Sequence, residues 1–168
     1  LVSVEHLRIG AETVEIASFA EVRPRWAAEL RAAVSGRVLK VTEQALTGER
    51  VDAGTLLVEI EHSRYRAELT AAEQALKQAK LDLAMAEKAT KVARRQFRQV
   101  GKTPPNDLAL HLPQLEIAKS AVQAAEARLI AGRQQLQDAQ ITAPFSGFIT
   151  RRFVSPGQSV NVGESIVK

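Results

Sequence analysis

The sequence predicts an α+β fold in which a small β sandwich is split by a long antiparallel coiled-coil hairpin. Two observations predict it. Apolar and small residues in the middle of the chain recur with four-three spacing, which is the pattern of a coiled-coil seam. Two segments on either side of this run resemble each other, and both carry the glycines and alternating apolar residues of strands joined by tight turns.

The helical part contains two seams separated by a helix-breaking segment. The break is GKTPPND, residues 101–107, whose glycine and paired prolines cannot continue a helix. A short break between two long helices forces an antiparallel hairpin, and at about 1.5 Å per residue its first arm reaches roughly 50 to 60 Å. The first seam consists of Tyr65, Leu69, Ala72, Leu76, Ala79, Leu83, Ala86, Thr90, Ala93, Phe97 and Val100, and the second of Leu115, Ala118, Val122, Ala125, Leu129, Gly132, Leu136 and Ala139.

Two prolines help to predict the residue at which the second helix begins. Thr103 followed by Pro104 predicts an N-cap and a first helical residue that open the arm. Pro113 then requires either a kink in the arm or a regular helix that starts only there.

The segments that flank the hairpin, residues 34–58 and 145–167, share one pattern. Each begins with Ser-Gly and an alternating apolar stretch, and each continues with the phrase G-x-x-V-x-x-G. Tight turns with φ > 0 explain the glycines of the phrase, and its valine can enter a small core. Chance repetition is the alternative, but the agreement in spacing favours two halves of one pseudo-symmetric β domain. The structural glycines are Gly36, Gly48 and Gly54 in the first half and Gly147, Gly157 and Gly163 in the second.

Composition excludes several classes of function. The net charge of +4 over 168 residues is too small to carry nucleic-acid binding by itself, and the absence of cysteine excludes disulfides and thiolate metal sites. The histidines His6, His62 and His111 have no companion ligand at metal spacing, so we expect no metal site. No catalytic grouping stands out, so we expect no catalytic residues and no cofactor.

One charged cluster remains. Lys91, Arg94, Arg95, Arg98 and Lys102 lie outside the seam at the end of the first arm, with spacings that place most of them along one flank of the helix. A solvated helix face is one interpretation, and a surface for an acidic or carbonyl-bearing partner is the other.

At this point the residues support a resemblance to a known family. The two halves resemble those of a biotinyl/lipoyl domain, and ITAPFSGFITRRFVSPGQSVNVGE, residues 141–164, is similar to the second half of that domain in the periplasmic adaptors, or membrane fusion proteins, of RND-type tripartite efflux pumps. Residues 14–38 resemble the segment that leads into the first half. The resemblance implies leading strands of an incomplete β-barrel in 1–29, lipoyl-like halves in 30–62 and 141–168, and the hairpin in 63–140.

The family implies a non-catalytic protein of the periplasm, anchored to the inner membrane through a segment outside this chain. It would link an inner-membrane transporter, RND-type by preference, to an outer-membrane TolC-like channel. The hairpin tip would dock the channel, and the lipoyl domains would self-associate into a ring. The later barrel strands and the membrane-proximal domain are expected to be missing, since the chain ends at Lys168.

The tip departs from the family's pattern for a TolC-like channel, which is an arginine, a leucine four residues later and a serine seven after that. Alignment on Gly101 places Phe97 at the leucine, but Ala93 and Pro104 at the other two positions. Arg94 and Thr103 are the nearest substitutes. We therefore take Arg94, Arg95, Phe97, Arg98, Lys102 and Thr103 as the candidate partner-binding residues.

Two other functions use related modules. An adaptor of an ABC-type exporter or a type I secretion system is the first, and secretion adaptors usually have much longer arms. An acyl or biotin carrier domain is the second. It would need a modifiable lysine on the turn between the halves, whereas the segment at that point, EIEHSRYR, contains none.

Overall fold

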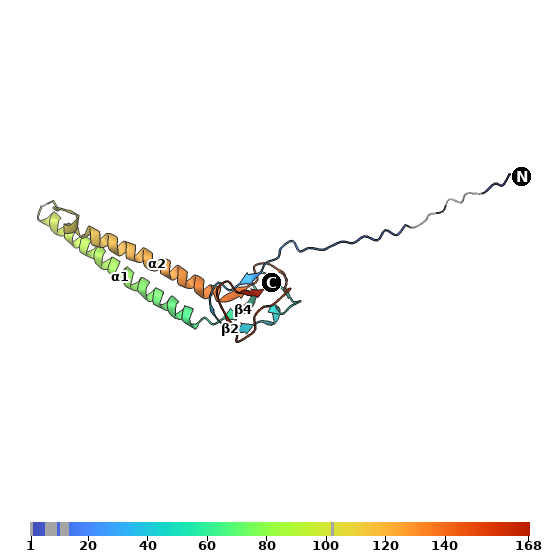
Figure 1. Ribbon diagram of the computed structural model, residues 1–168. Helices are drawn as coiled ribbons and strands as arrows, with labels where there is room; N and C mark the ends of the chain where they lie inside the picture. The colour runs from blue at the N-terminus through green and yellow to red at the C-terminus, as the bar shows by residue number, and fades with distance from the viewer. Residues whose placement is uncertain (1, 6–9, 11–13, 102) are drawn as a thin grey trace.

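A computed structural model describes residues 2–5, 10, 14–101 and 103–168, and it shows a helical hairpin projecting from a small β domain (Figure 1). The chain enters and leaves the hairpin at one end of the β domain. The strands are β1 (Leu30–Arg31), β2 (Gly36–Val41), β3 (Arg50–Val51), β4 (Leu56–Ile60), β5 (Gln140–Thr142), β6 (Gly147–Phe148), β7 (Ser159–Val160) and β8 (Ser165–Val167). The helices are α1 (Ser63–Gln99) and α2 (Leu112–Asp138), with short 3-10 turns η1 (Glu43–Ala45) and η2 (Asp107–Leu110).

Strands from the two halves pair with each other throughout the β domain. A four-stranded sheet has the order β5-β4-β2-β7, and two smaller ladders join β1 to β8 and β3 to β6. All of these pairs are antiparallel. Four of the five join a strand before the hairpin to one after it. The expected β domain built from both sides of the hairpin is therefore confirmed.

The turns of the two halves exchange equivalent hydrogen bonds. The N–H of Gly48 donates to the carbonyl of Ile149 at 2.7 Å, and the N–H of Gly157 donates to the carbonyl of Val38 at 2.8 Å. At the second glycine of each phrase, Gly54 donates to Ala143 at 2.7 Å, and Gly163 donates to Ala32 at 2.8 Å. Each half thus caps the strands of the other, which explains the repeated glycine phrase as a pseudo-twofold relation.

The glycines serve two different purposes. Gly48, Gly54, Gly157 and Gly163 have φ of 94°, 83°, 85° and 87°, a region that other residues rarely adopt. Gly36 instead allows a close approach, because a Cβ there would lie 2.7 Å from Cγ2 of the buried Ile60. Gly147, its counterpart in the second half, is less crowded, with the ring of Phe145 at 3.7 Å.

The core is a layer of aliphatic side chains drawn from both halves. Neither half alone could bury them, because each contributes only short strands. Its buried members from the two halves include Val38, Val51, Leu57, Ile149, Val160 and Ile166.

The coiled-coil seam matches its prediction residue by residue. In α1 every seam residue from Tyr65 to Phe97 is buried or half-buried, and every other residue of that helix is exposed. In α2 the seam residues are likewise covered, and only Leu112 and Asp138 at the helix ends are partly buried outside it. Val100 is the exception. It is 66% exposed because α1 ends at Gln99, so the seam closes at Phe97.

Large and small residues alternate across the seam. A Cβ at Gly132 would lie 3.5 Å from Cα of Leu69, which sets these two residues level with each other. Because the arms are antiparallel, this register puts a large residue opposite a small one at each level, so the backbones can approach closely. The pairs are Leu69 with Gly132, Ala72 with Leu129, Leu76 with Ala125, Ala79 with Val122, Leu83 with Ala118, and Ala86 with Leu115.

The start of the second arm differs from the prediction. Thr103 and Pro104 do not open a helix. Pro105 disfavours the helical conformation at the residue before it, so Pro104 cannot be a first helical residue. Asn106 caps η2 instead, and its Oδ1 accepts a hydrogen bond from the N–H of Ala109 at 2.9 Å. Regular helix starts at Leu112, which is the alternative that Pro113 allowed.

The leading strands expected in residues 1–29 stay a prediction. They belong to an incomplete barrel, and the residues described there, 2–5, 10 and 14–29, form no strand in this chain by itself. The first strand begins at Leu30. A strand needs a hydrogen-bonded neighbour, and the described chain provides none for this segment.

The seam generates a stability prediction. Replacing Leu76 or Leu83 with Asp places a carboxylate without a partner between the arms and lowers the free energy of unfolding by about 2 to 4 kcal/mol. Leu81 is the matched control, because it lies on the same helix with about half of its surface exposed. Leu81→Asp is expected to change stability by less than about 0.5 kcal/mol. Urea denaturation followed by circular dichroism measures both, and equal effects at the two kinds of position would contradict the two-stranded seam.

The pseudo-symmetric glycines give a second prediction. Gly36→Ala forces the new methyl group against Ile60, whose branched side chain is buried and cannot move away, and costs about 1 to 3 kcal/mol. Gly147→Ala places its methyl at ordinary contact distance from Phe145 and costs less than about 1 kcal/mol. The difference between the midpoints of unfolding of these two variants tests the close approach. It would be refuted by a Gly147 variant that is the less stable of the two.

Candidate functional site

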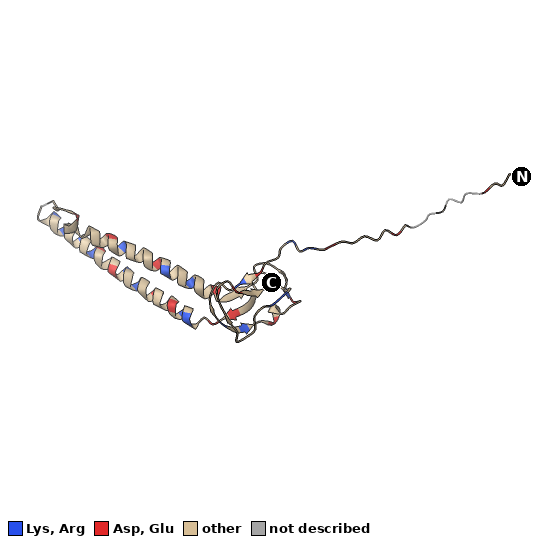
Figure 2. Cartoon of the chain, viewed as in Figure 1, with Lys and Arg blue, Asp and Glu red and all other residues tan. Residues whose placement is uncertain are grey.

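The hairpin tip carries a basic cluster on the outside of α1. Lys91, Arg94, Arg95 and Arg98, here called the tip cluster, are all exposed. From Lys88 to Asn106 the sequence contains no acidic residue. The other candidate cation, Lys102, lies outside the described residues. Figure 2 shows Lys and Arg in blue along the hairpin.

Ion pairs occur elsewhere on the hairpin but do not engage the tip cluster. Arg64 pairs with Glu68 at 3.3 Å, and Lys80 of α1 pairs with Glu126 of α2 at 3.8 Å. Within the part of the chain that the structure describes, no carboxylate lies within salt-bridge distance of a tip-cluster side chain. Arg98 in the last turn of α1 also complements the negative end of the helix dipole. The remaining cations have no such role and keep their charge available to a partner.

The residues at and near the positions of the family's tip pattern differ in how exposed they are. Ala93, at the position where the family pattern has arginine, is 6% exposed in the seam and is not available on the surface. Arg94, one residue later, is exposed. Phe97 is half-buried and closes the seam, and Thr103 is exposed in the turn. The turn therefore brings an arginine, an aromatic edge and a hydroxyl to one end of the hairpin.

Sequence reasoning missed a hollow beside the tip cluster. Its volume is about 390 Å³, and its lining is Met85, Lys88, Ala89, Val92, Ala93, Gln96 and His111. His111 lies between η2 and α2 with φ of 56°, a conformation that turns the chain into the second arm. The seven-residue spacing of Met85 and Val92 was the available signal, because it marks a second apolar row outside the seam.

That second row extends along α1. Leu81, Met85 and Val92 lie on the helix face opposite the seam, and each leaves about half of its surface exposed. From Ala67 to Met85 the same face carries no charge, and Lys88 ends this uncharged row before Val92. We call the uncharged part the outer stripe, and its members are Ala67, Ala71, Gln74, Gln78, Leu81 and Met85.

The β domain has an apolar groove on its surface, next to the segment that leads into β1. The groove has a volume of about 520 Å³ and is lined by residues that include Trp26, Phe145 and Phe148. The side chain of Trp26 is 68% exposed, and the Arg25 guanidinium lies 5.6 Å from the centre of its ring.

The leading segment is held at its end by a polar contact. Ser165 of β8 donates a hydrogen bond to the carboxylate of Glu29. This hydrogen bond, with Arg31 nearby, holds the pKa of Glu29 below its ordinary value. The contact fixes the chain just before β1 to the last strand of the domain.

Two features are absent from the part of the chain that the structure describes. No group of three or more His, Cys, Asp or Glu side chains lies close enough together to hold a metal ion, and His6 lies outside the described residues. None of the helices in the described part of the chain has an apolar stretch long enough to cross a membrane.

Comparisons with known proteins agree on one family. Residues 26–167 match the family described as RND MFP, barrel-sandwich hybrid domain. The multidrug resistance protein MdtA of Pectobacterium atrosepticum is 30% identical over 166 residues, which are 97% of this chain and 37% of that protein. The chain thus spans little more than a third of the length of this curated relative.

Solved structures share the fold. A chimeric MacA–MexA protein that contains the Pseudomonas aeruginosa MexA α-hairpin domain has a TM-score of 0.60 and 24% identity, over 83% of this chain and 45% of that one. MacA from Actinobacillus actinomycetemcomitans has a TM-score of 0.58 and 23% identity, over 86% of this chain and 49% of that one. The match over residues 26–167 and the 30% identity to MdtA agree with the split β domain and the hairpin. The chain therefore belongs to the membrane fusion protein, or periplasmic adaptor, family.

Proposed function

We propose that this chain is the central part of a non-catalytic adaptor that links an inner-membrane RND-type transporter to an outer-membrane TolC-like channel. The observation that carries the proposal is the combination found at the hairpin tip. There the exposed tip cluster, the end of the apolar seam at Phe97 and the turn after Gly101 come together, far from the β domain.

The chemistry of the tip supports a partner with acidic side chains or exposed carbonyls. The tip cluster has no carboxylate partner among the described residues, so a channel could complete its ion pairs without breaking existing ones. The hollow lined by Met85, Val92 and His111 adds apolar contact area beside these charges. Apolar contact surrounded by charge is the usual composition of a specific interface.

Arm length supports an efflux adaptor over a secretion adaptor. α1 has 37 residues and α2 has 27, whereas the secretion adaptors have much longer arms. The match to a family described as RND MFP supports an RND-type transporter as the inner-membrane partner over an ABC-type exporter.

We further propose that the protein acts in the periplasm, held at the inner membrane, and that its copies form a ring through their β domains. The groove that contains Trp26 and Phe148 supports self-association, because exposed aromatic side chains are enriched in interfaces. The outer stripe gives each hairpin a second uncharged surface along which neighbouring arms could lie. Residues 1–29 would form strands by pairing with other parts of the full-length protein.

Charge reversal at the tip tests the proposal. In the full-length protein, changing Arg94, Arg95 and Arg98 together to Glu is expected to abolish pump-dependent drug resistance, while folding, export and transporter binding are retained. These side chains are exposed at the far end of the hairpin, so they do not support the β domain. Drug susceptibility of cells and crosslinking to the channel measure the effect.

A matched reversal elsewhere on the hairpin provides the control. Lys77, Arg128 and Arg133 are exposed basic residues away from the tip, and changing them to Glu alters the net charge by the same amount. This variant should keep resistance. If the tip variant expresses normally, still crosslinks to the channel and confers full resistance, tip docking is wrong.

A further inference from the structure

The hairpin joins the β domain through two short backbone connections. At the end of α2 the chain passes directly into β5 through Ala139, which is fully buried and accepts a hydrogen bond from the N–H of Ile60 at 2.8 Å. At the start of α1 the connection from β4 consists of Glu61 and His62, with one backbone hydrogen bond from Glu61 to Arg37 at 2.8 Å. Because each connection is short and makes one backbone hydrogen bond to the β domain, the tilt of the hairpin relative to that domain also depends on side-chain contacts.

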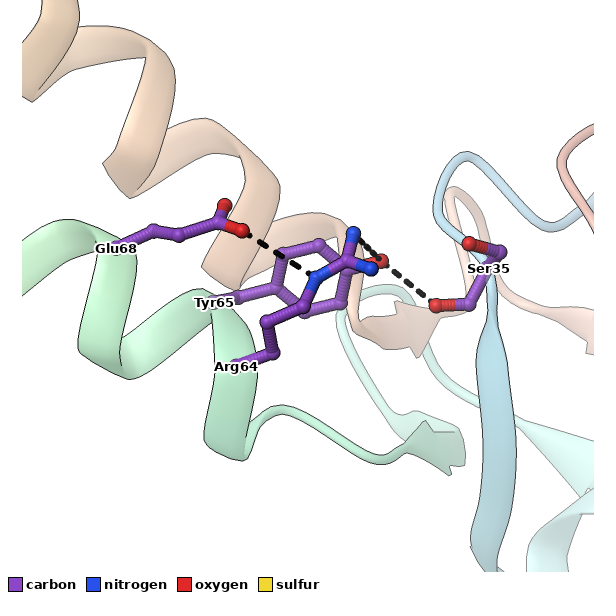
Figure 3. A network of polar contacts seen from close by, with 4 residues as sticks. All are labelled: Ser35, Arg64, Tyr65 and Glu68. Carbon is purple, nitrogen blue, oxygen red and sulfur yellow. Dashed lines mark hydrogen bonds and ion pairs between the residues drawn. The ribbon is translucent and has the colours of Figure 1, made fainter.

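Tyr65 provides a contact that neither connection supplies. Its ring is buried in the first turn of α1, and its hydroxyl donates a hydrogen bond of 2.6 Å to the carbonyl of Ser35 (Figure 3). Ser35 belongs to the loop between β1 and β2, so this bond ties the hairpin to a part of the β domain that does not adjoin it in the sequence.

Neighbouring side chains hold the ring in this position. The guanidinium of Arg64 lies over the Tyr65 ring at 4.9 Å from its centre, and Arg64 Nε lies 3.3 Å from Oε1 of Glu68 one turn further along α1. Figure 3 shows the three side chains and the Ser35 carbonyl as one chain of contacts. The ring is therefore covered on its outer face by a cation that is itself fixed to the helix.

The hydroxyl is not required for the seam. Other seam positions of α1 carry aliphatic side chains, Thr90 or Phe97, and a phenylalanine at position 65 would fill the same space. The hydroxyl adds its bond to Ser35 and accepts a longer hydrogen bond of 3.5 Å from Nη2 of Arg64, which is on the same helix. A buried hydrogen bond such as the one to Ser35 contributes about 1 kcal/mol of net stability. This is a small part of the free energy of folding, but the bond directly restrains the angle between the hairpin and the β domain.

The length of the hairpin makes that angle important. α1 extends about 55 Å from its base, so a tilt of about 10° moves the tip by about 10 Å. A hydrogen bond or an ion pair at the tip forms only when its two groups are placed to within much less than about 10 Å of the required position. Docking at the tip thus depends on how firmly the base is held.

We propose that Tyr65 is a positioning residue that fixes the direction of the hairpin through its hydrogen bond to the Ser35 carbonyl. The consequence for channel docking rests on the proposed function, whereas the fixing of the hairpin does not. A structural role in folding alone would affect stability without changing the spread of tip positions.

The cysteine-free sequence allows a direct test in the full-length protein. Dyes on Gln99→Cys at the tip and Thr47→Cys in the β domain, both exposed positions, report the tip distance by single-molecule energy transfer. Any native cysteines outside this chain would first be replaced. Because a tilt moves the tip mainly across the line that joins the two dyes, Tyr65→Phe is expected to widen the spread of distances by about 2 to 3 Å while the circular dichroism spectrum stays the same.

Leu76→Val is the control, because it loosens seam packing away from the base of the hairpin and leaves the contacts of Tyr65 in place. It should lower stability by about 1 kcal/mol and leave the spread of distances unchanged. An unchanged spread in Tyr65→Phe, or an equal widening in both variants, would overturn the proposal. Loss of resistance on tip charge reversal together with an unchanged spread would retain tip docking and reject Tyr65 as its positioning residue.

Discussion

The pairing of β4 with β5 is the contact on which the rest of the structure depends. These strands flank the hairpin, and in their register Glu59 faces Gln140. Neighbouring antiparallel strands are normally joined by a tight turn of a few residues. Here the connection is the whole hairpin. The chain leaves β4, runs through two long helices and must then return beside β4 to form β5. The antiparallel seam makes this possible, because it brings the end of α2 back beside the start of α1.

Once the chain has returned, the second half completes the first. The exchanged hydrogen bonds of the glycine turns and the shared aliphatic core can form only between halves held at the correct spacing. The β domain and the hairpin therefore support each other. The domain fixes the base of the hairpin, and the hairpin brings together the halves of the domain.

Much of this architecture follows from periodic features of the sequence. The four-three spacing identified the residues that the two arms bury, and the repeated glycine phrase identified the turns of both halves, because each pattern reflects a local rule that repeats. Non-periodic features were harder to predict. The paired prolines moved the helix start from Thr103 to Asn106 and then Leu112, through a steric effect of Pro105 on the residue before it.

The Tyr65 contact to Ser35 and the hollow at His111 could not be predicted, since each joins residues far apart in sequence without a recurring pattern. The strands expected in residues 1–29 depend on pairing partners that the described chain does not provide. The candidate tip residues were identified as a charged cluster outside the seam, and the seam pattern placed Ala93 between the arms, where it is 6% exposed.

The alternation of large and small residues across the seam has a consequence for how such a molecule can change in evolution. A seam that repeats every seven residues accepts the insertion of one heptad in each arm without altering which side chains meet, provided that both insertions are made at the same level. Each such pair of insertions lengthens the hairpin by about 10 Å and leaves the β domain unaltered, because the two ends still meet at Ser63 and Gln140. The hairpin is in this sense an adjustable spacer, and the distance it spans can change in fixed steps while the domain that holds it stays the same.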